Sequence, residues 1–180
     1  MQPVLVVIGG LPATGKSTIA AALATETATP YIRVDRIEQA IVTWSTLSHP
    51  VGPVGYAVAH QLAIEQLKLG LDAIVECVNP VQVTRDAWPA TASVAGATLV
   101  EVEVICSDPA EHRRRVEHRA TDVDGLVKPT WAEVVNREYE PWNRTCVTVD
   151  SATTPVASAV QQIRAAVLAA RSARGQSGRH

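Results

Sequence analysis

The sequence predicts an α/β protein with three layers, in which helices cover both faces of a parallel sheet. Strand-like and helix-like segments alternate along the whole chain, as expected for a doubly wound parallel sheet. Hydrophobic residues make up 47% of the 180 residues but Phe is absent, which favours a core of Val, Ile, Leu and Ala. A phosphate-binding signature directly follows the first apolar segment. A chain of this length most often forms one domain.

The phosphate-binding signature is the stretch G-L-P-A-T-G-K-S at residues 10–17, which fully matches G-x-x-x-x-G-K-[ST]. The apolar run V-L-V-V-I at residues 4–8 precedes it and is typical of a buried parallel strand. Residues 16–26 follow it with no Gly or Pro and predict a helix. A chance glycine-rich turn is the competing interpretation, and both flanking elements argue against it.

This loop predicts a site for ATP and Mg²⁺. Gly10 and Gly15 allow backbone conformations that turn the loop N–H groups inward, and the start of the helix adds its positive end. Lys16 is expected to reach the β- and γ-phosphates, and the Ser17 hydroxyl is expected to bind Mg²⁺. The expected nucleotide-binding residues of the loop are Gly10, Leu11, Pro12, Ala13, Thr14, Gly15, Lys16, Ser17 and Thr18.

The next elements follow from apolar runs and from residues that interrupt them. Residues 31–34 predict a second strand, and Asp35 is expected to cap a helix over residues 35–44. Glu101 and Glu103 alternate with valines in a later strand, which predicts one partly solvated face. The remaining predictions are a loop at 45–53, a helix at 54–69, a strand at 72–78, a helix at 81–95 broken or kinked at Pro89, and the strand at 98–106.

The second half of the chain begins with a strongly basic helix at residues 109–119 and a loop at 121–129. Thr130 is expected to cap a helix that runs to about Tyr139, and residues 147–149 predict the fifth strand. The last helix is predicted from residue 154 to about residue 170. We therefore expect one domain over residues 1–170, with a lid at about 109–142, and a flexible tail at 171–180.

Charge and composition disfavour several classes of function. The formal net charge of -2 provides no basic excess for long nucleic acids. The chain has no run of about 18 apolar residues and no signal peptide, so we expect a cytoplasmic protein without a membrane span. Cys77, Cys106 and Cys146 lack the spacing of a zinc site and are expected to be buried, reduced thiols.

Three further segments carry a family resemblance. They are V-D-R-I at residues 34–37, E-C-V-N-P-V-Q-V-T-R at 76–85, and S-D-P-A-E-H-R-R-R-V-E-H-R at 107–119. With the phosphate loop, they resemble the small P-loop kinases of the zeta-toxin, chloramphenicol phosphotransferase and gluconate kinase group, over about residues 4–168. The resemblance implies a three-layer P-loop fold with strand order 2-3-1-4-5 and a helical lid. It also implies transfer of the ATP γ-phosphate to a hydroxyl group of a small molecule, with antibiotic, sugar and nucleoside acceptors all open.

Two acidic residues at strand ends are candidates for this chemistry. Asp35 matches the V-D motif of these kinases and is the expected general base, because an alcohol acceptor needs a carboxylate to orient its hydroxyl and take its proton; a plain helix cap is the alternative. Glu76 ends an apolar strand and is expected to hold Mg²⁺ or its waters, although these kinases more often carry Asp there. Asn79 is expected to orient the acceptor or its loop, or to be a turn residue before Pro80.

Basic residues of the lid helix are the next candidates. Arg115 and Arg119 are four residues apart, share a helix face, and match the R-x-x-x-R lid of the resembled kinases, where they would stabilise charge on the transferred phosphoryl group. A solvated face with salt bridges is the alternative, and it is the expected state of Arg113 and Arg114. The resemblance also places Asp150 in the loop that contacts adenine.

Acceptor binding is expected from segments that cover the acceptor in the resembled kinases. For Trp44 core packing is the alternative, and for His60 a structural role. The aromatic residues Trp131, Tyr139 and Trp142 are expected to pack the lid helix onto the domain. The expected acceptor-binding residues are Asp35, Arg36, Trp44, Tyr56, His60, Gln61, Asn79 and Arg85.

Two other functions stay open from the sequence. One is a nucleoside or polynucleotide 5′-hydroxyl kinase, because E-C-V-N at residues 76–79, followed by Arg85, also resembles the D-x-x-N and Arg of that group. The other is a non-catalytic switch module that binds ATP without an acceptor. Asp35 and the paired lid arginines favour chemistry over binding alone. The protein is expected to be a monomer or a homodimer.

Overall fold

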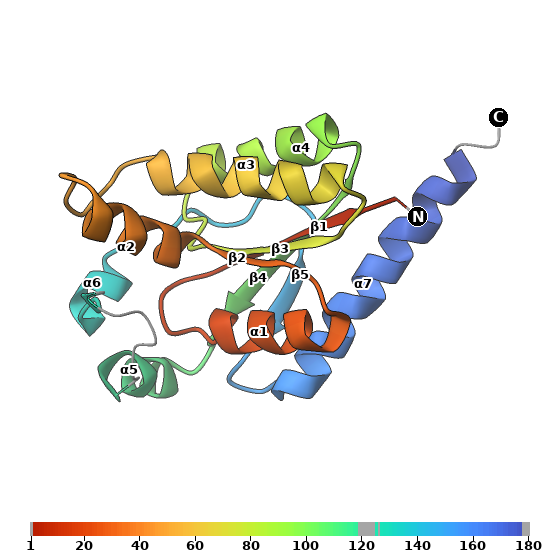
Figure 1. Ribbon diagram of the computed structural model, residues 1–180. Helices are drawn as coiled ribbons and strands as arrows, with labels where there is room; N and C mark the ends of the chain where they lie inside the picture. Colours follow the sequence, from red (N-terminus) through yellow and green to blue (C-terminus); the bar gives the residue numbers. More distant parts are fainter. Residues whose placement is uncertain (1, 119–124, 126, 178–180) are drawn as a thin grey trace.

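A computed structural model describes residues 2–118, 125 and 127–177. Its centre is a five-stranded parallel sheet with strand order β2-β3-β1-β4-β5. Helices cover both faces of this sheet (Figure 1), which confirms the predicted three-layer P-loop fold and strand order. The strands are β1 (Val4–Gly9), β2 (Tyr31–Arg33), β3 (Ala73–Glu76), β4 (Thr98–Ile105) and β5 (Val147–Asp150).

The two faces of the sheet are built by the alternation of side chains along each strand. All of β1 is buried, as expected for a central parallel strand. Val4, Val6 and Ile8 pack in the core beneath α1 (Lys16–Thr27) and α7 (Val156–Ser177). Leu5 and Val7 pack in the opposite core, beneath α3 (Val54–Lys68) and α4 (Gln82–Val94).

The remaining helices lie at one end of the sheet. These are α2 (Val34–Trp44), α5 (Pro109–His118) and α6 (Trp131–Val135). In Figure 1 they lie beyond the end at which β1 leads into the phosphate loop, which is the carboxyl end of all five strands. In open α/β sheets this end is where ligands bind.

Strand register aligns the acidic end of β3 with the start of the phosphate loop. Ile8 of β1 lies opposite Glu76 of β3, and Glu76 in turn lies opposite Arg33 of β2. Arg33, Glu76 and the loop after Ile8 therefore lie in one row across the carboxyl end of three neighbouring strands. This row is the base of the site described below.

Three helix boundaries differ from the sequence predictions. Helix α2 begins at Val34 with Arg33 as N-cap, so Asp35 lies inside the first turn and is not the cap. Helix α6 ends at Val135 and not near Tyr139, and the chain then leaves helical geometry so that the Glu140 N–H can bond to the Pro80 carbonyl. Helix α7 runs to Ser177, past the predicted end near Ala170, and the added part contains the good helix formers Arg171, Ala173 and Arg174.

Smaller corrections concern a proline and two cysteines. Pro89 lies inside α4 without ending it. Glu101 and Glu103 are partly exposed and alternate with buried valines, which confirms the predicted partly solvated face of β4, and burial raises the pKa of both carboxyls. Cys77 is buried as expected, whereas Cys106 and Cys146 are partly exposed. Among the described residues, no helix combines the length and apolar character needed to cross a membrane.

Candidate active site

The phosphate loop has the backbone geometry that its glycines predict. Gly10 and Gly15 have φ values of 144° and 99°, which residues with a side chain rarely adopt. A Cβ atom at position 10 would lie 2.2 Å from the Val104 carbonyl oxygen, so only glycine fits there. The Lys16 ammonium donates to the Leu11 carbonyl at 2.7 Å, which holds it over the loop.

A cavity of about 1490 Å³ opens beside this loop. The loop forms one end of the cavity, and α2, the start of α3 and the 127–137 segment form the other walls. This volume is large enough for a nucleotide and a small second substrate together. The sequence-predicted site residues that line it are Pro12, Ala13, Gly15, Lys16, Ser17, Thr18, Asp35, Tyr56, Glu76 and Arg115.

The two predicted Mg²⁺ ligands lie together. The Ser17 hydroxyl donates to Glu76 Oε1 at 2.6 Å, and the Tyr31 hydroxyl donates to the other carboxylate oxygen. Arg33 Nε lies 3.6 Å from Glu76 Oε2. Burial, with the negative charge of Glu76, raises the pKa of Tyr31, so its phenol stays protonated as a donor. A hydroxyl and a carboxylate are the oxygen donors that suit Mg²⁺.

Asp35 lines the same cavity but is already engaged. Arg33 binds both of its oxygens, with Nε–Oδ1 and Nη2–Oδ2 distances of 3.1 and 2.8 Å. The Arg36 backbone N–H also donates to Oδ1 at 2.8 Å. The Asp35 side chain remains 37% exposed, so a substrate hydroxyl can still reach it. Arg33 therefore fixes the direction in which this carboxylate points.

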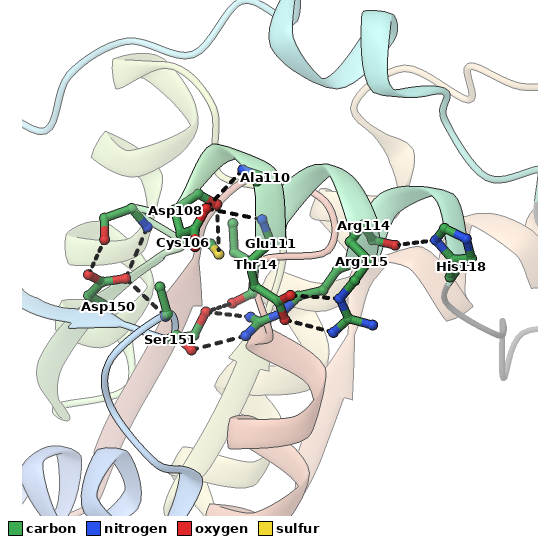
Figure 2. A network of polar contacts seen from close by, with 12 residues as sticks. Thr14, Cys106, Asp108, Ala110, Glu111, Arg114, Arg115, His118, Asp150 and Ser151 are labelled. Atoms are coloured by element: carbon green, nitrogen blue, oxygen red, sulfur yellow. Dashed lines mark hydrogen bonds and ion pairs between the residues drawn. The ribbon is translucent and has the colours of Figure 1, made fainter.

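Arg115 connects the basic helix to the phosphate loop (Figure 2). Its Nη1 donates to Ser151 Oγ at 2.8 Å, and that hydroxyl donates to the Thr14 carbonyl at 2.6 Å. Arg115 Nε donates to Glu111 Oε1 at 2.7 Å. Hydrogen bonds from Arg114 and Arg115 lower the pKa of Glu111 to about 2, so this carboxylate is ionised at neutral pH.

A second contact holds α5 against the loop. His112 is buried, and its Nε2 donates to the Pro12 carbonyl at 2.8 Å. Its ring meets Trp131 edge to face at a centroid distance of 5.3 Å, so Trp131 packs against the basic helix as expected. Arg113 and Arg114 form exposed salt bridges with Glu117 and Glu111, which matches the solvated-face interpretation. Arg119 lies outside the described residues.

Asp150 does not line the cavity. Its carboxylate accepts hydrogen bonds from the backbone N–H groups of Ser107 and Ala152, each at 3.0 Å, and from the Ser107 hydroxyl. These bonds, those of Ser107 first, lower the pKa of Asp150. This loop presents Ser151 and Thr154 to the cavity. The Asp150 carboxylate shapes the loop through these hydrogen bonds, and nucleotide binding by this loop stays a prediction.

Several predicted acceptor residues lie away from the main cavity. Trp44 is 88% exposed at the end of α2, so it is neither core nor pocket. Arg36 lines a separate, smaller hollow beside α1 and β2, and Gln61 is exposed on α3. His60 bonds to Thr91 Oγ1 at 2.7 Å and stacks on Trp88 at 3.8 Å, and burial lowers its pKa, which fits the structural alternative.

Arg85 is a structural residue, and this corrects its predicted contact with the acceptor. It is fully buried and donates to four backbone carbonyls. Two belong to the β3–α4 loop (Asn79 and Pro80) and two to the segment after α6 (Glu140 and Pro141). Its guanidinium also lies over the rings of Trp142 and Tyr139, so these aromatics pack on Arg85 and not on the lid helix.

Asn79 is also part of this structural unit. It is fully buried, has a left-handed backbone with φ of 53°, and does not line the cavity. Its N–H donates to the Tyr56 hydroxyl at 3.0 Å. This is the turn role that the sequence left open. Tyr56 remains the predicted acceptor residue that both lines the cavity and supports the β3–α4 loop.

Within the described part of the chain, the cavity is lined by five charged residues that the sequence analysis did not select: Arg33, Glu38, Lys128, Glu133 and Arg137. A signal for Glu38 existed, because it lies three residues after Asp35 and so shares its helix face. Arg33 could have been found from the strand register, which sets it opposite Glu76. Arg137 follows α6, whose early end the sequence did not reveal.

The sequence of this chain matches one known protein family. Residues 5–139 match the model of a family described as AAA domain. No curated protein matches the chain.

Three solved structures illustrate the similarity of the fold, and two of them are a gluconokinase and an APS kinase. A Chloroflexus aurantiacus protein superposes with a TM-score of 0.74 at 20% identity, covering 94% of this chain and 98% of that one. The gluconokinase from Sinorhizobium meliloti superposes with a TM-score of 0.65 at 20% identity, covering 98% of both chains. The APS kinase from Mycobacterium tuberculosis, in complex with AMPPNP and APS, superposes with a TM-score of 0.67 at 15% identity, covering 92% of this chain and 98% of that one. Identities at this level show a shared fold.

Proposed function

Because the chain belongs to the AAA domain family and has the fold of the small P-loop kinases, we propose that it is an ATP-dependent phosphotransferase whose acceptor is a hydroxyl group of a small molecule. One observation carries the proposal. A phosphate loop, a serine–carboxylate pair suited to Mg²⁺ and a second carboxylate, Asp35, line the same cavity. Binding of a nucleotide alone needs the first two features, whereas Asp35 adds a group that can act on a second substrate.

The nucleotide is proposed to bind along the loop, with its phosphates on the loop N–H groups and the start of α1. Lys16 would leave the Leu11 carbonyl and contact the β- and γ-phosphates. Ser17 and Glu76 would hold Mg²⁺, since their hydrogen bond already brings the two oxygen donors together. When bound, the ion supplies positive charge that neutralises the phosphate oxygens.

The proposed reaction is an in-line transfer. A bond forms between the acceptor oxygen and the γ-phosphorus, and the bond from that phosphorus to the bridging oxygen of ADP breaks. The hydroxyl proton passes to Asp35, whose orientation Arg33 fixes. Arg115 would move from Ser151 toward the phosphoryl group and stabilise its charge, which makes residues 109–142 a proposed lid.

A small molecule is favoured as acceptor over a nucleic-acid end. The formal net charge is -2, so the chain has no basic excess to attract a phosphate backbone. Such a kinase could act in the cytoplasm, as the sequence predicts. The acceptor's chemical class is argued in the next subsection.

The test is ATP consumption with Mg²⁺ over a panel of hydroxyl-bearing compounds, with the phosphorylated product detected by mass spectrometry. Wild-type protein should turn over faster with one acceptor class. Lys16→Ala should abolish turnover, and Asp35→Asn should lower it by about 10²–10⁴ while ATP affinity is retained. Tight ATP binding with no product from any acceptor would contradict the kinase and favour the ATP-binding switch.

A further inference from the structure

Glu38 is a cavity carboxylate without an evident structural task. It lies on α2, one turn after Asp35, and lines the same cavity with Tyr56 and Arg137. Its side chain is partly buried. Within the part of the chain that the structure describes, its carboxylate takes no hydrogen bond and forms no ion pair within 4 Å. By contrast, Glu133 in the same cavity wall is occupied by the Thr130 capping box.

The packing of α3 leaves room for this side chain. Gly55 is a buried residue of α3, and a Cβ atom there would lie 2.4 Å from Glu38 Cγ and 3.0 Å from Glu38 Oε1. Glycine is unfavourable within a helix, and its φ at position 55 does not require it. The space that Gly55 leaves is therefore filled by the Glu38 side chain, which also lines the cavity. This packing fixes the position of Glu38 in the cavity wall.

The electrostatic surroundings leave Glu38 poorly compensated. Burial raises the pKa of its carboxyl, the nearby negative charge of Asp35 raises it further, and Arg137 lowers it. Among the described residues, Tyr56 on α3 and Cys77 after β3 also interact with its charge, and both are neutral at pH 7 because burial raises their pKa values. His49, Lys128 and Glu133 line the same cavity. A partly desolvated carboxylate with so few partners gains strongly from a new hydrogen-bond donor.

We propose that Glu38 binds a second hydrogen-bond donor of the acceptor, next to the hydroxyl that Asp35 receives. The inference rests on the proposed function. Residues three apart on a helix have Cβ atoms roughly 5–6 Å apart, so the two carboxylates can accept from neighbouring substituents of one molecule. The acceptor class is therefore a polyol, sugar or amino alcohol with adjacent donors, and a simple monohydric alcohol is a poor substrate.

The kinetic test uses matched probes: cyclohexanol, 1,2-cyclohexanediol and 2-aminocyclohexanol, with D-glucose, D-gluconate and D-glucosamine as larger acceptors. Wild-type protein should prefer the diol or amino alcohol over cyclohexanol by at least about tenfold in kcat/KM. Glu38→Gln should raise the acceptor KM about tenfold, with a smaller change in kcat and unchanged ATP affinity. An unchanged KM, or a diol preference that survives Glu38→Gln, would overturn the inference while leaving the kinase intact.

A second measurement needs no acceptor. If Glu38 is held ready for a ligand, the ligand-free Glu38→Gln protein should melt higher than wild type by roughly 2–4 °C at pH 7.5, because a poorly compensated buried charge is removed. Glu65→Gln, an exposed carboxylate on α3, is the matched control and should change nothing. A lower melting temperature for Glu38→Gln would make Glu38 a packing residue and overturn the inference. If no acceptor is phosphorylated by the wild-type protein, the proposed kinase function is rejected. The melting temperatures would still show whether Glu38 is a packing residue.

Discussion

The Ser17 hydroxyl and the Glu76 carboxylate are joined by a hydrogen bond of 2.6 Å, although they are 59 residues apart in the sequence. The parallel pairing of β1 with β3 causes this, because it sets Ile8 opposite Glu76 at the point where the phosphate loop begins. The extra methylene of Glu, relative to Asp, lets the carboxylate reach the first turn of α1. Tyr31 and Arg33 hold the other carboxylate oxygen.

Removing either member of this pair should weaken the response to Mg²⁺. Ser17→Ala and Glu76→Gln are each expected to raise the Mg²⁺ concentration for half-maximal turnover by at least about tenfold, the range seen when metal ligands lose their support. A Mg²⁺ titration at fixed ATP measures this. Ser17→Thr keeps the hydroxyl and should behave like wild type. An unshifted titration in Glu76→Gln would remove Glu76 from the proposed metal site.

Arg115 should affect catalysis far more than its neighbour Arg113. Arg115 is tied to Ser151 beside the phosphate loop, whereas Arg113 forms an exposed pair with Glu117. Arg115→Ala is expected to lower kcat by about 10³-fold, as for other arginines that stabilise a transferred phosphoryl group. Arg113→Ala should leave kcat unchanged and alter stability by less than about 1 kcal/mol. Equal kinetics for the two variants would assign Arg115 to structure alone.

Arg85 should matter for stability. Arg85→Ala removes a buried guanidinium and leaves carbonyls of Asn79, Pro80, Glu140 and Pro141 without this donor, so we expect a loss of about 3 kcal/mol in the free energy of unfolding by urea. Arg85→Lys should rescue little, because an ammonium cannot span these acceptors or stack on Trp142. Full stability together with a raised acceptor KM would restore the substrate role that the sequence predicted.

Gly55 and Glu38 should show strong energetic coupling. Gly55→Ala places a Cβ atom 2.4 Å from Glu38 Cγ and is expected to destabilise the protein by about 1–3 kcal/mol. In a Glu38→Ala background the overlap disappears, so the same change should be close to neutral. A double-mutant cycle in urea measures the coupling, expected at about 1–2 kcal/mol. Additive effects would mean that α3 adjusts without reference to Glu38.

The stability gain of Glu38→Gln should depend on pH in one direction. The pKa of Glu38 is raised above its usual value of 4.5, so ionisation costs the folded state. Below about pH 4 the carboxyl is protonated in both states and the penalty is absent. As the pH rises through the pKa that Glu38 has in the folded protein, the wild type loses stability relative to the Glu38→Gln protein. Above that pKa the difference in stability is constant. Urea unfolding of both proteins at pH 4 and pH 8 tests this, and a gain that shrinks toward pH 8 would contradict it.

Local sequence signals were enough to predict the layers of the fold and the phosphate-binding end of the site. The run V-L-V-V-I before the glycine loop specifies a buried parallel strand, and the family resemblance supplied the strand order. Ser17 and Glu76 were correctly paired because each occupies an end of an element whose position the fold determines. Arg113 and Arg114 were correctly assigned to a solvated face from their charge pattern.

The acceptor end was harder to predict because it depends on side-chain packing between distant segments. Arg85 has the sequence position of a substrate ligand, yet four carbonyls from two segments bury it. Trp44 has the composition of a pocket residue and is exposed, because α2 ends beyond the sheet. The relationship between Glu38 and Gly55 could not be predicted from the sequence, because it depends on the contact between α2 and α3.

The segment between β4 and β5 is fastened at both of its ends. At its start Ser107 is bonded to Asp150, and at its end the Glu140 N–H is bonded to the Pro80 carbonyl, with Arg85 beneath. Between these two points, α5 also bonds to the phosphate loop through His112 and to Ser151 through Arg115. Apart from these contacts, the side chains of the segment can diverge between related proteins, and substrate preference can change with them, while the two attachment points and the phosphate loop keep their geometry.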